Sequence, residues 1–307
     1  MTAGGSQHPD FALPQWAQMW PERFLSKLDG DEPGSVPVKL RAFQIIFALV
    51  ICTEYWTKAL RRWGELEVED VTSLVLVTLL CAAVSQGRWR RAACGGLALL
   101  QTWYVWSLFP MAGNHRYLEI AIAALFTVLD DESPEEQRLL LRSLRWLVVL
   151  VLFYSGLQKL VHGYYFRGQF LAYSLWRDAF RSTLGPLLAS GELDRLVSYG
   201  AAAGDGPYLT SSPLFVAASN AVWIVEIALG VLLIPLATRK LALISACIFM
   251  VATEAVAREL MFGVEFVCAI LLFARTGLLR RLIWPAAVFL AVLVVIRLGF
   301  LPEILFH

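Results

Sequence analysis

One lysine, Lys159, combines a chemically useful side chain with an unusual position. The stretch from Trp146 to Tyr173, WLVVLVLFYSGLQKLVHGYYFRGQFLAY, is unbroken apolar as far as Tyr154, and Lys159 follows the small pair Ser155-Gly156. Because about 20 apolar residues cross a bilayer as a helix, Lys159 is expected near the exit end of a membrane helix. Its amine then either extends to the lipid headgroups or stays in apolar surroundings, where an uncharged amine can act as a base.

Other ionisable residues also interrupt apolar runs, where such groups are functional candidates. They are Glu226 in NAVWIVEIALGVLLIPL and Glu254, Arg258 and Glu259 in MVATEAVARELMF. A carboxylate such as Glu226 must there be paired, protonated or directed into a cavity. Glu254 and Arg258 are one helical turn apart, so a clamp that holds the bundle together is the alternative to a functional role. Glu54 and Lys58 have the same spacing and are expected to form a structural pair.

Asn114 and His115 begin a further apolar run, directly after an aromatic-rich one. Trp103 and Trp106 of that preceding run would form a wall suited to a flat ring ligand. Aromatic side chains also anchor helices at the membrane interface, so both interpretations of the wall are open.

The composition indicates an integral membrane protein. Of 307 residues, 58% are hydrophobic and only 17% are charged, whereas soluble domains are about 45–50% apolar and about 25% charged. The net charge of +1 gives no case for nucleic-acid binding. The five cysteines fall in or beside apolar runs without metal-like spacing, so they are expected to be small core residues and no metal is predicted.

The apolar runs predict an all-α, polytopic transmembrane bundle of eight or nine helices. They cover about 40–60, 71–86, 92–109, 117–129, 144–161, 214–236, 240–257, 260–274 and 282–299. Residues 1–38 would precede this domain, either as a helix lying on the membrane face or as a disordered tail, and residues 39–307 would form it. Within it, residues 163–213 mix aromatic and charged side chains. They are expected to form either amphipathic interfacial helices, which could cover Lys159, or a plain interfacial loop.

The distribution of basic residues predicts the orientation. Lysines and arginines are more numerous in the segments that lie inside if the N-terminus is cytoplasmic. His115, the end of the helix that carries Lys159, and Arg258-Glu259 would then all lie on the extracytoplasmic side.

Three segments, in this order, resemble the HTTM family, the transmembrane module shared with vitamin K-dependent gamma-glutamyl carboxylase. GNHRYLEIAIAALFTVLDDES is similar to the family's N-H-x-Y-L helix start with an acidic turn after the helix. FYSGLQKLVHGYYFRGQFLAYSL is similar to its Gly-x-x-Lys stretch, and EIALGVLLIPLATRKLALISACIFMVATEAVARELMFGVEFVCAILLF to its paired helices. The resemblance covers most of residues 40–275.

This resemblance implies a quinol-dependent enzyme. In the carboxylase, a lysine takes a proton from reduced vitamin K, reaction with O2 then generates a strong base, and a deprotonated glutamate adds CO2. Lys159 matches that lysine, His115 the active-site histidine, and Asn114 the asparagine near the quinone. The residues expected at the quinone are Asn114, Tyr154, Trp103, Trp106 and Tyr165. The implied cofactors are vitamin K or menaquinone hydroquinone, O2 and, for carboxylation, CO2, and the implied partners are membrane lipids and a peptide or small-molecule substrate.

The chain also departs from the carboxylase. It ends at His307, so the large lumenal domain that binds the carboxylase's protein clients is not expected. Met250 stands where many relatives carry histidine, and Gln158 stands where the carboxylase has a second lysine. The alternative function is therefore a non-catalytic quinone- or lipid-binding membrane module, or a maturation or immunity partner of a secreted peptide.

Overall fold

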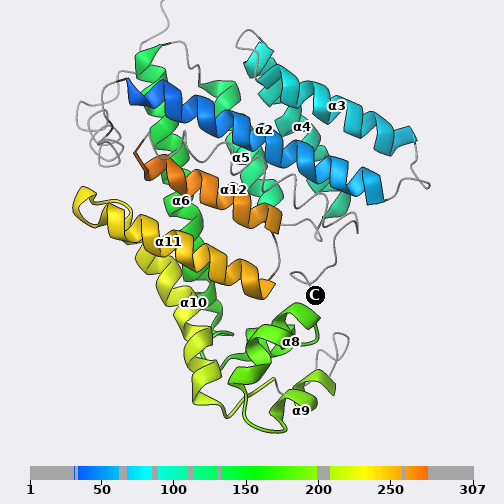
Figure 1. Cartoon of the computed structure of the whole chain (residues 1–307), viewed down its shortest axis with the longest axis vertical. Helices are drawn as coiled ribbons and strands as arrows, with labels where there is room; N and C mark the ends of the chain where they lie inside the picture. Colours follow the sequence, from blue (N-terminus) through cyan, green and yellow to red (C-terminus); the bar gives the residue numbers. More distant parts are fainter. Residues whose placement is uncertain are drawn as a thin grey trace, which may run out of the picture.

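The computed structural model describes residues 31, 34–61, 68–84, 89–109, 114–129, 133–198, 208–257 and 260–275. Every regular element within these ranges is helical, which confirms the predicted all-α class (Figure 1). The expected N-terminal segment lies almost wholly outside the described residues, and so does the apolar run at 282–299.

The helices follow one another in three groups along the chain. The first comprises α2 (Ser35–Arg61), α3 (Val68–Val84), α4 (Arg90–Leu108), α5 (Asn114–Val128) and α6 (Pro134–His162). The second comprises the short elements α7 (Gln169–Ser174), α8 (Asp178–Leu184), η2 (Gly185–Leu187) and α9 (Glu192–Ser198), within the stretch where interfacial helices were predicted. The third comprises α10 (Pro213–Leu232), α11 (Leu236–Ala257), α12 (Leu260–Ile270) and η3 (Leu271–Phe273).

The predicted count of eight or nine membrane-spanning helices is not supported. Within the described ranges, four helices are long and apolar enough to cross a membrane: Ser35–Thr57, Pro134–His162, Pro213–Leu232 and Leu236–Ala257. Two shorter apolar helices cover Val71–Val84 and Phe262–Phe273. With 15 residues in α5 and 11 in α12, a rise of about 1.5 Å per residue leaves both well short of a hydrocarbon layer of about 30 Å.

The core lies where α2, α4, α5, α6 and α12 meet (Figure 1). The ring of Phe43 stacks on those of Phe47 and Phe126, each at 6.2 Å between centroids, and so joins α2 to α5. The five cysteines are all free, and Cys81, Cys94 and Cys268 are buried. Their predicted role as small core residues is confirmed for these three.

Helix α6 begins earlier than its apolar run suggested. The Ser133 side chain caps it by accepting a hydrogen bond from the backbone N–H of Glu136 at 3.1 Å, and Pro134 occupies the first turn. Gly163, with φ of 71°, ends it in the left-handed conformation that glycine adopts readily. Lys159 thus lies in the last turn of α6, where the sequence predicted it.

A polar anchor holds the start of α2 against α6 and η3. Arg145 donates hydrogen bonds to both carboxylate oxygens of Asp31, at 2.6 and 2.7 Å, and Lys39 donates to one of them at 2.7 Å. Arg145 and Lys39 both also donate to the carbonyl oxygen of Leu272. Burial raises the pKa of Asp31, but the hydrogen bonds and charges of Arg145 and Lys39 outweigh it and hold the pKa below its usual value.

Candidate functional site

The last turn of α6 places Lys159 against Glu226 in the middle of α10. The Lys159 Nζ atom donates to the two Glu226 carboxylate oxygens at 2.8 and 2.7 Å and to Ser155 Oγ at 2.6 Å. The Ser155 hydroxyl donates in turn to Glu226 Oε1 at 3.2 Å. The Lys159 side chain is 19% exposed and that of Glu226 is 11% exposed. This mostly buried Lys159–Glu226 pair provides the partner that an intramembrane carboxylate requires.

Two glycines allow α6 and α10 to approach closely enough for the pair to form. A Cβ atom added to Gly156 would lie 2.8 Å from the carbonyl oxygen of Trp223 and 2.7 Å from a side-chain carbon of Ile227. A Cβ atom on Gly230 would lie 3.1 Å from the backbone nitrogen of Phe153. Small residues at helix crossings are the usual means of bringing membrane helices into backbone contact.

Substitution of Gly156 by alanine is therefore expected to force α6 and α10 apart and to weaken the Lys159–Glu226 pair. The expected loss is about 1–3 kcal/mol of stability, because the added methyl group meets backbone atoms that cannot rotate away. Thermal unfolding of the purified protein in detergent measures it. Gly96→Ala is the control, since its Cβ would meet only the end of the Leu80 side chain, which can move. Equal effects of the two substitutions would contradict this account.

Tyr165 covers the pair at the end of α6. Its ring centroid lies 5.6 Å from Lys159 Nζ, within the range of a cation–π contact. Ser219 of α10 donates a hydrogen bond to the Tyr165 carbonyl oxygen at 2.8 Å, and the Phe170 ring stacks on the Tyr165 ring at 5.0 Å. Burial and the negative charge of Glu226 raise the pKa of Tyr165, so its phenol is uncharged. The start of the 163–213 segment thus lies over Lys159.

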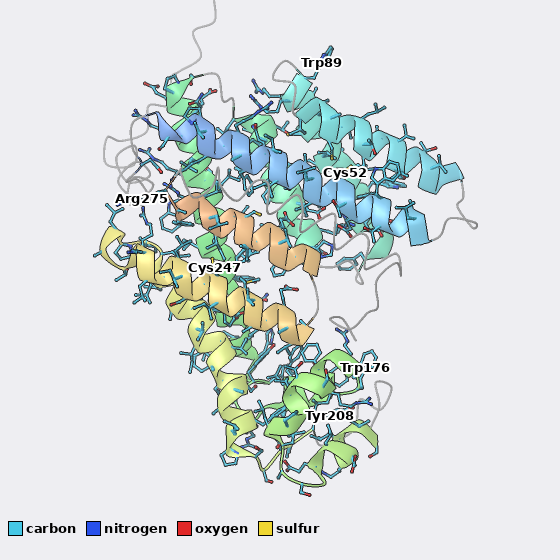
Figure 2. All side chains as sticks on the ribbon, in the orientation of Figure 1. Cys52, Trp89, Trp176, Tyr208, Cys247 and Arg275 are labelled. Atoms are coloured by element: carbon cyan, nitrogen blue, oxygen red, sulfur yellow. The ribbon has the colours of Figure 1, made fainter. Side chains whose placement is uncertain are left out.

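The rest of this segment is tied to the start of α10. Glu192 accepts hydrogen bonds from the Ser211 N–H at 2.7 Å and from the Thr210 hydroxyl at 2.8 Å. The Ser211 N–H contributes most to lowering the pKa of Glu192 from 4.5 to about 2. Tyr208 packs edge-on against Tyr173 at 5.3 Å between ring centroids. Figure 2 shows Tyr208 beside the short helices of this segment. The cover is therefore a packed element with its own apolar cluster around Phe215.

A second group of polar side chains is centred on Arg116 of α5. We call it the Arg116 cluster. It contains Glu54, Gln101, His115, Arg116, Glu119 and Glu265. Arg116 is 1% exposed and donates to Gln101 Oε1 and to Glu119 Oε2, each at 2.9 Å, and also to Glu54. Its guanidinium lies 4.9 Å from the ring centroid of Tyr104.

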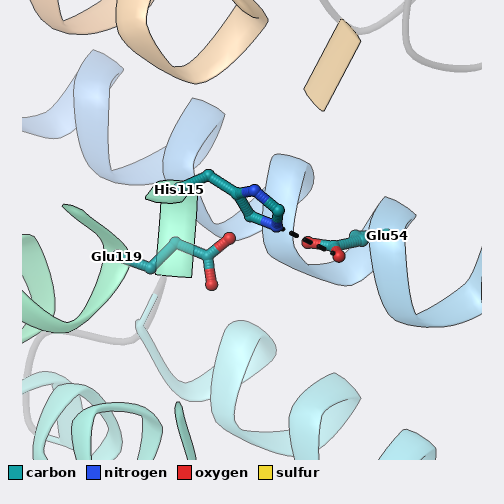
Figure 3. Close-up of side chains that lie close together, drawn as sticks. All are labelled: Glu54, His115 and Glu119. Atoms are coloured by element: carbon teal, nitrogen blue, oxygen red, sulfur yellow. Dashed lines mark ion pairs between the residues drawn. The ribbon is translucent and has the colours of Figure 1, made fainter. Parts of the chain in front are cut away.

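His115 belongs to this cluster. Its Nε2 atom lies 3.5 Å from Glu54 Oε1, and Figure 3 shows the imidazole pointing toward that carboxylate. Glu119 follows one helical turn later on α5, and ligand atoms of His115, Glu54 and Glu119 all lie within 4.8 Å of one another. Glu265 reaches the cluster from α12, since its charge interacts with those of Glu119 and Glu54.

Lys159 and His115, the two residues that the resemblance placed in one catalytic site, have different partners in the structure. In the described part of the chain, Lys159 bonds to Ser155 and Glu226, whereas His115 faces Glu54. The two residues share no partner there. Each instead belongs to its own buried polar group.

Most of the other predicted site residues lie on the surface or outside the described side chains. Trp103, Trp106 and Tyr154 are 69%, 79% and 60% exposed, so they face away from both polar groups. Glu254 is half-buried against Gly263, whose added Cβ would lie 2.4 Å from the carboxyl carbon. The predictions for Asn114, Lys58, Arg258 and Glu259 fall on side chains outside the described set.

Sequence reasoning missed several members of the Arg116 cluster. Arg116 and Glu119 lie within the quoted GNHRYLEIAIA segment, and Glu265 interrupts MFGVEFVCAILLF. The signal that singled out Glu226, a charged residue inside an apolar run, applies equally to Glu265.

Comparison of the chain with protein families, with curated proteins and with solved structures gives no match.

Proposed function

We propose that this protein is a membrane enzyme that takes a proton from a reduced quinone and uses O2 to activate a peptide or small organic substrate for carboxylation. The observation that carries the proposal is the Lys159–Glu226 pair, a mostly buried acid–base unit under Tyr165 in an apolar helix bundle. Ionisable groups in such surroundings are retained chiefly where they bind or move charge. The resemblance to the HTTM family supplies the chemistry.

The geometry of the pair favours Glu226 as the group that accepts the proton. All three hydrogens that a Lys159 ammonium carries have oxygen acceptors within 2.8 Å, in Ser155 and the two Glu226 oxygens. In this arrangement Lys159 would hold the oxygen that loses its proton, while the Glu226 carboxylate takes that proton. A reduced quinone would give up four electrons in all, two on oxidation to the quinone and two from the double bond that is epoxidised. One oxygen atom of O2 would then enter the epoxide, and the other would leave as water with the two hydroquinone hydrogens.

The surroundings of the pair suit a membrane-dissolved cofactor. The side chains of Lys159 and Glu226 keep a small accessible surface, through which a hydroxyl group of the hydroquinone could reach them. The ring of Tyr165, 5.6 Å from Lys159 Nζ, would meet the flat ring of a quinone bound there. Lysines and arginines are more numerous in every second segment between the apolar runs, which supports a cytoplasmic N-terminus. The end of α6 that carries Lys159 would then be extracytoplasmic, and this orientation needs further membrane-spanning helices besides the four described ones.

The test uses the purified full chain in lipid nanodiscs. The protein is incubated anaerobically with menaquinone or vitamin K hydroquinone, O2 is admitted, and the quinone epoxide is measured by mass spectrometry. Glu226→Gln and Lys159→Met are expected to lower the rate by about 100- to 10,000-fold, the usual contribution of a positioned acid–base group. Lys240→Met, an exposed lysine on α11, is the control and should retain the native rate. Absence of epoxide with the native protein, or native rates in both pair variants, would refute the proposal.

One observation favours the second candidate, a non-catalytic quinone- or lipid-binding module. The same hydrogen bonds that satisfy Lys159 also link α6 to α10, which is what a purely structural pair would do. Saturable binding of the hydroquinone to the native protein without epoxide formation would support this alternative.

A further inference from the structure

The Arg116 cluster contains more negative than positive charge among its described side chains. Glu54, Glu119 and Glu265 are 4%, 1% and 1% exposed, and Arg116 is the cation that donates hydrogen bonds to Glu54 and Glu119. Carboxylates buried without compensation are strongly unfavourable in an apolar bundle. Protons or a bound cation would offset this excess of negative charge among the described side chains.

The positions of three side chains suit a metal ion. His115 and Glu119 are four residues apart on α5, which places them on one face of the helix, and Glu54 approaches from α2. Their ligand atoms lie within 4.8 Å of one another (Figure 3). Two ligand atoms bound to one ion are at most about 4.4 Å apart, which is twice the usual bond length. Small rotations of the three side chains would therefore bring all three ligand atoms within bonding distance of one ion.

A separate helix supplies independent support. Glu265 of α12 is 1% exposed, and neither of its carboxylate oxygens has a hydrogen-bond partner among the described residues. Helix α12 packs against α2 and α5, the helices that carry Glu54, Arg116 and Glu119, so Glu265 lies near this cluster. His115 Nε2 is also buried and forms no hydrogen bond to a described residue. Buried polar atoms are nearly always satisfied, so these atoms indicate a further group at this point.

We propose that Glu54, His115 and Glu119 bind a divalent transition-metal ion, with Glu265 providing the remaining negative charge. One imidazole with carboxylates is a ligand set for Zn²⁺, Mn²⁺ or Fe²⁺, whereas Mg²⁺ and Ca²⁺ prefer oxygen ligands alone. Glutamate and histidine side chains from facing helices build the metal sites of other helical bundles. The inference is independent of the quinol-dependent function and differs from the sequence-based expectation of no metal.

Arg116 is compatible with such an ion. A carboxylate accepts at about four lone-pair positions, so Glu54 and Glu119 can bind Arg116 and a metal together. The hydrogen bond from Arg116 to Glu119 and that to Glu54 would orient both ligands. Outer partners of this kind fix the geometry of metal ligands in proteins.

The experiment measures metal content in the full chain. Purified protein is stripped with a chelator, loaded anaerobically with Zn²⁺, Mn²⁺, Fe²⁺ or Co²⁺ in separate samples, desalted and analysed by mass spectrometry for metal. One ion per chain is expected for at least one of these metals. His115→Ala and Glu119→Gln should each weaken the affinity of the protein for that metal by at least about 10- to 100-fold. A loss of this size follows the removal of residues that only hydrogen-bond to metal ligands, so the removal of a ligand itself should cost no less.

Two controls separate this site from others. His162→Ala removes an exposed histidine of α6, and Glu226→Gln removes the carboxylate of the other polar group, and both should leave the affinity unchanged. If His115→Ala fails to fold, nitrogen hyperfine coupling in the electron paramagnetic resonance spectrum of the native Mn²⁺- or Co²⁺-loaded protein reports the imidazole ligand. Failure of the native protein to retain any of the metals, an unchanged affinity in both ligand variants, or absence of that coupling would overturn the proposal.

Discussion

Replacement of Arg116 by methionine is expected to destabilise the protein by about 3–5 kcal/mol, the cost of leaving a buried charge without its partner. Arg116 is 1% exposed and holds Glu54 and Glu119 with direct hydrogen bonds. Methionine fills a similar volume but leaves these carboxylates, and Glu265 nearby, without a counter-charge. The measurement is the unfolding free energy of the purified protein in mixed detergent micelles.

Three comparisons identify the cause of this loss. Arg138→Met removes an exposed arginine of α6 and should change stability little. Arg116→Met combined with Glu119→Gln should regain part of the loss, because one unpaired charge is gone. Added Zn²⁺ or Mn²⁺ should also stabilise Arg116→Met if the cluster binds a metal. A loss no greater than that of Arg138→Met would show that Arg116 does not neutralise the cluster.

The Lys159–Glu226 pair is expected to show strong coupling in a double-mutant cycle. Lys159→Met alone should cost about 3–5 kcal/mol because Glu226 then remains charged and mostly buried. Lys159→Met together with Glu226→Leu should recover most of this stability, because two apolar side chains suit the apolar α6–α10 contact. The coupling is measured from unfolding free energies of the native protein, the two single variants and the double variant, and should be about 3 kcal/mol or more.

The same variants distinguish a functional pair from a structural one. The stable double variant should still lack quinone epoxidation if the pair moves the proton. Additive effects of the two single substitutions would mean that the residues do not depend on each other, contrary to the two short contacts that join them.

The sequence predicted the helical class and the place of Lys159 because both depend on local patterns. The apolar run ending at Tyr154 determines a helix, and Gly163 determines where it stops. The predicted number of membrane-spanning helices is not supported among the described residues, because hydropathy alone does not separate a spanning helix from a shorter buried one. Helix α5 illustrates this, since Ile122, Ala123 and Phe126 are apolar and lie in the protein core.

The partners of the charged residues were decided by tertiary packing. Lys159 and Glu226 are 67 residues apart in sequence, and they meet because Gly156 and Gly230 let α6 and α10 touch. His115 meets Glu54 of α2 through the packing of the helices, so it lies in the Arg116 cluster, whereas Lys159 pairs with Glu226. The sequence by itself therefore determined which residues were unusual for an apolar bundle. Only the packing of the helices decided which of them pair, because an ion pair depends on distances that no local pattern specifies.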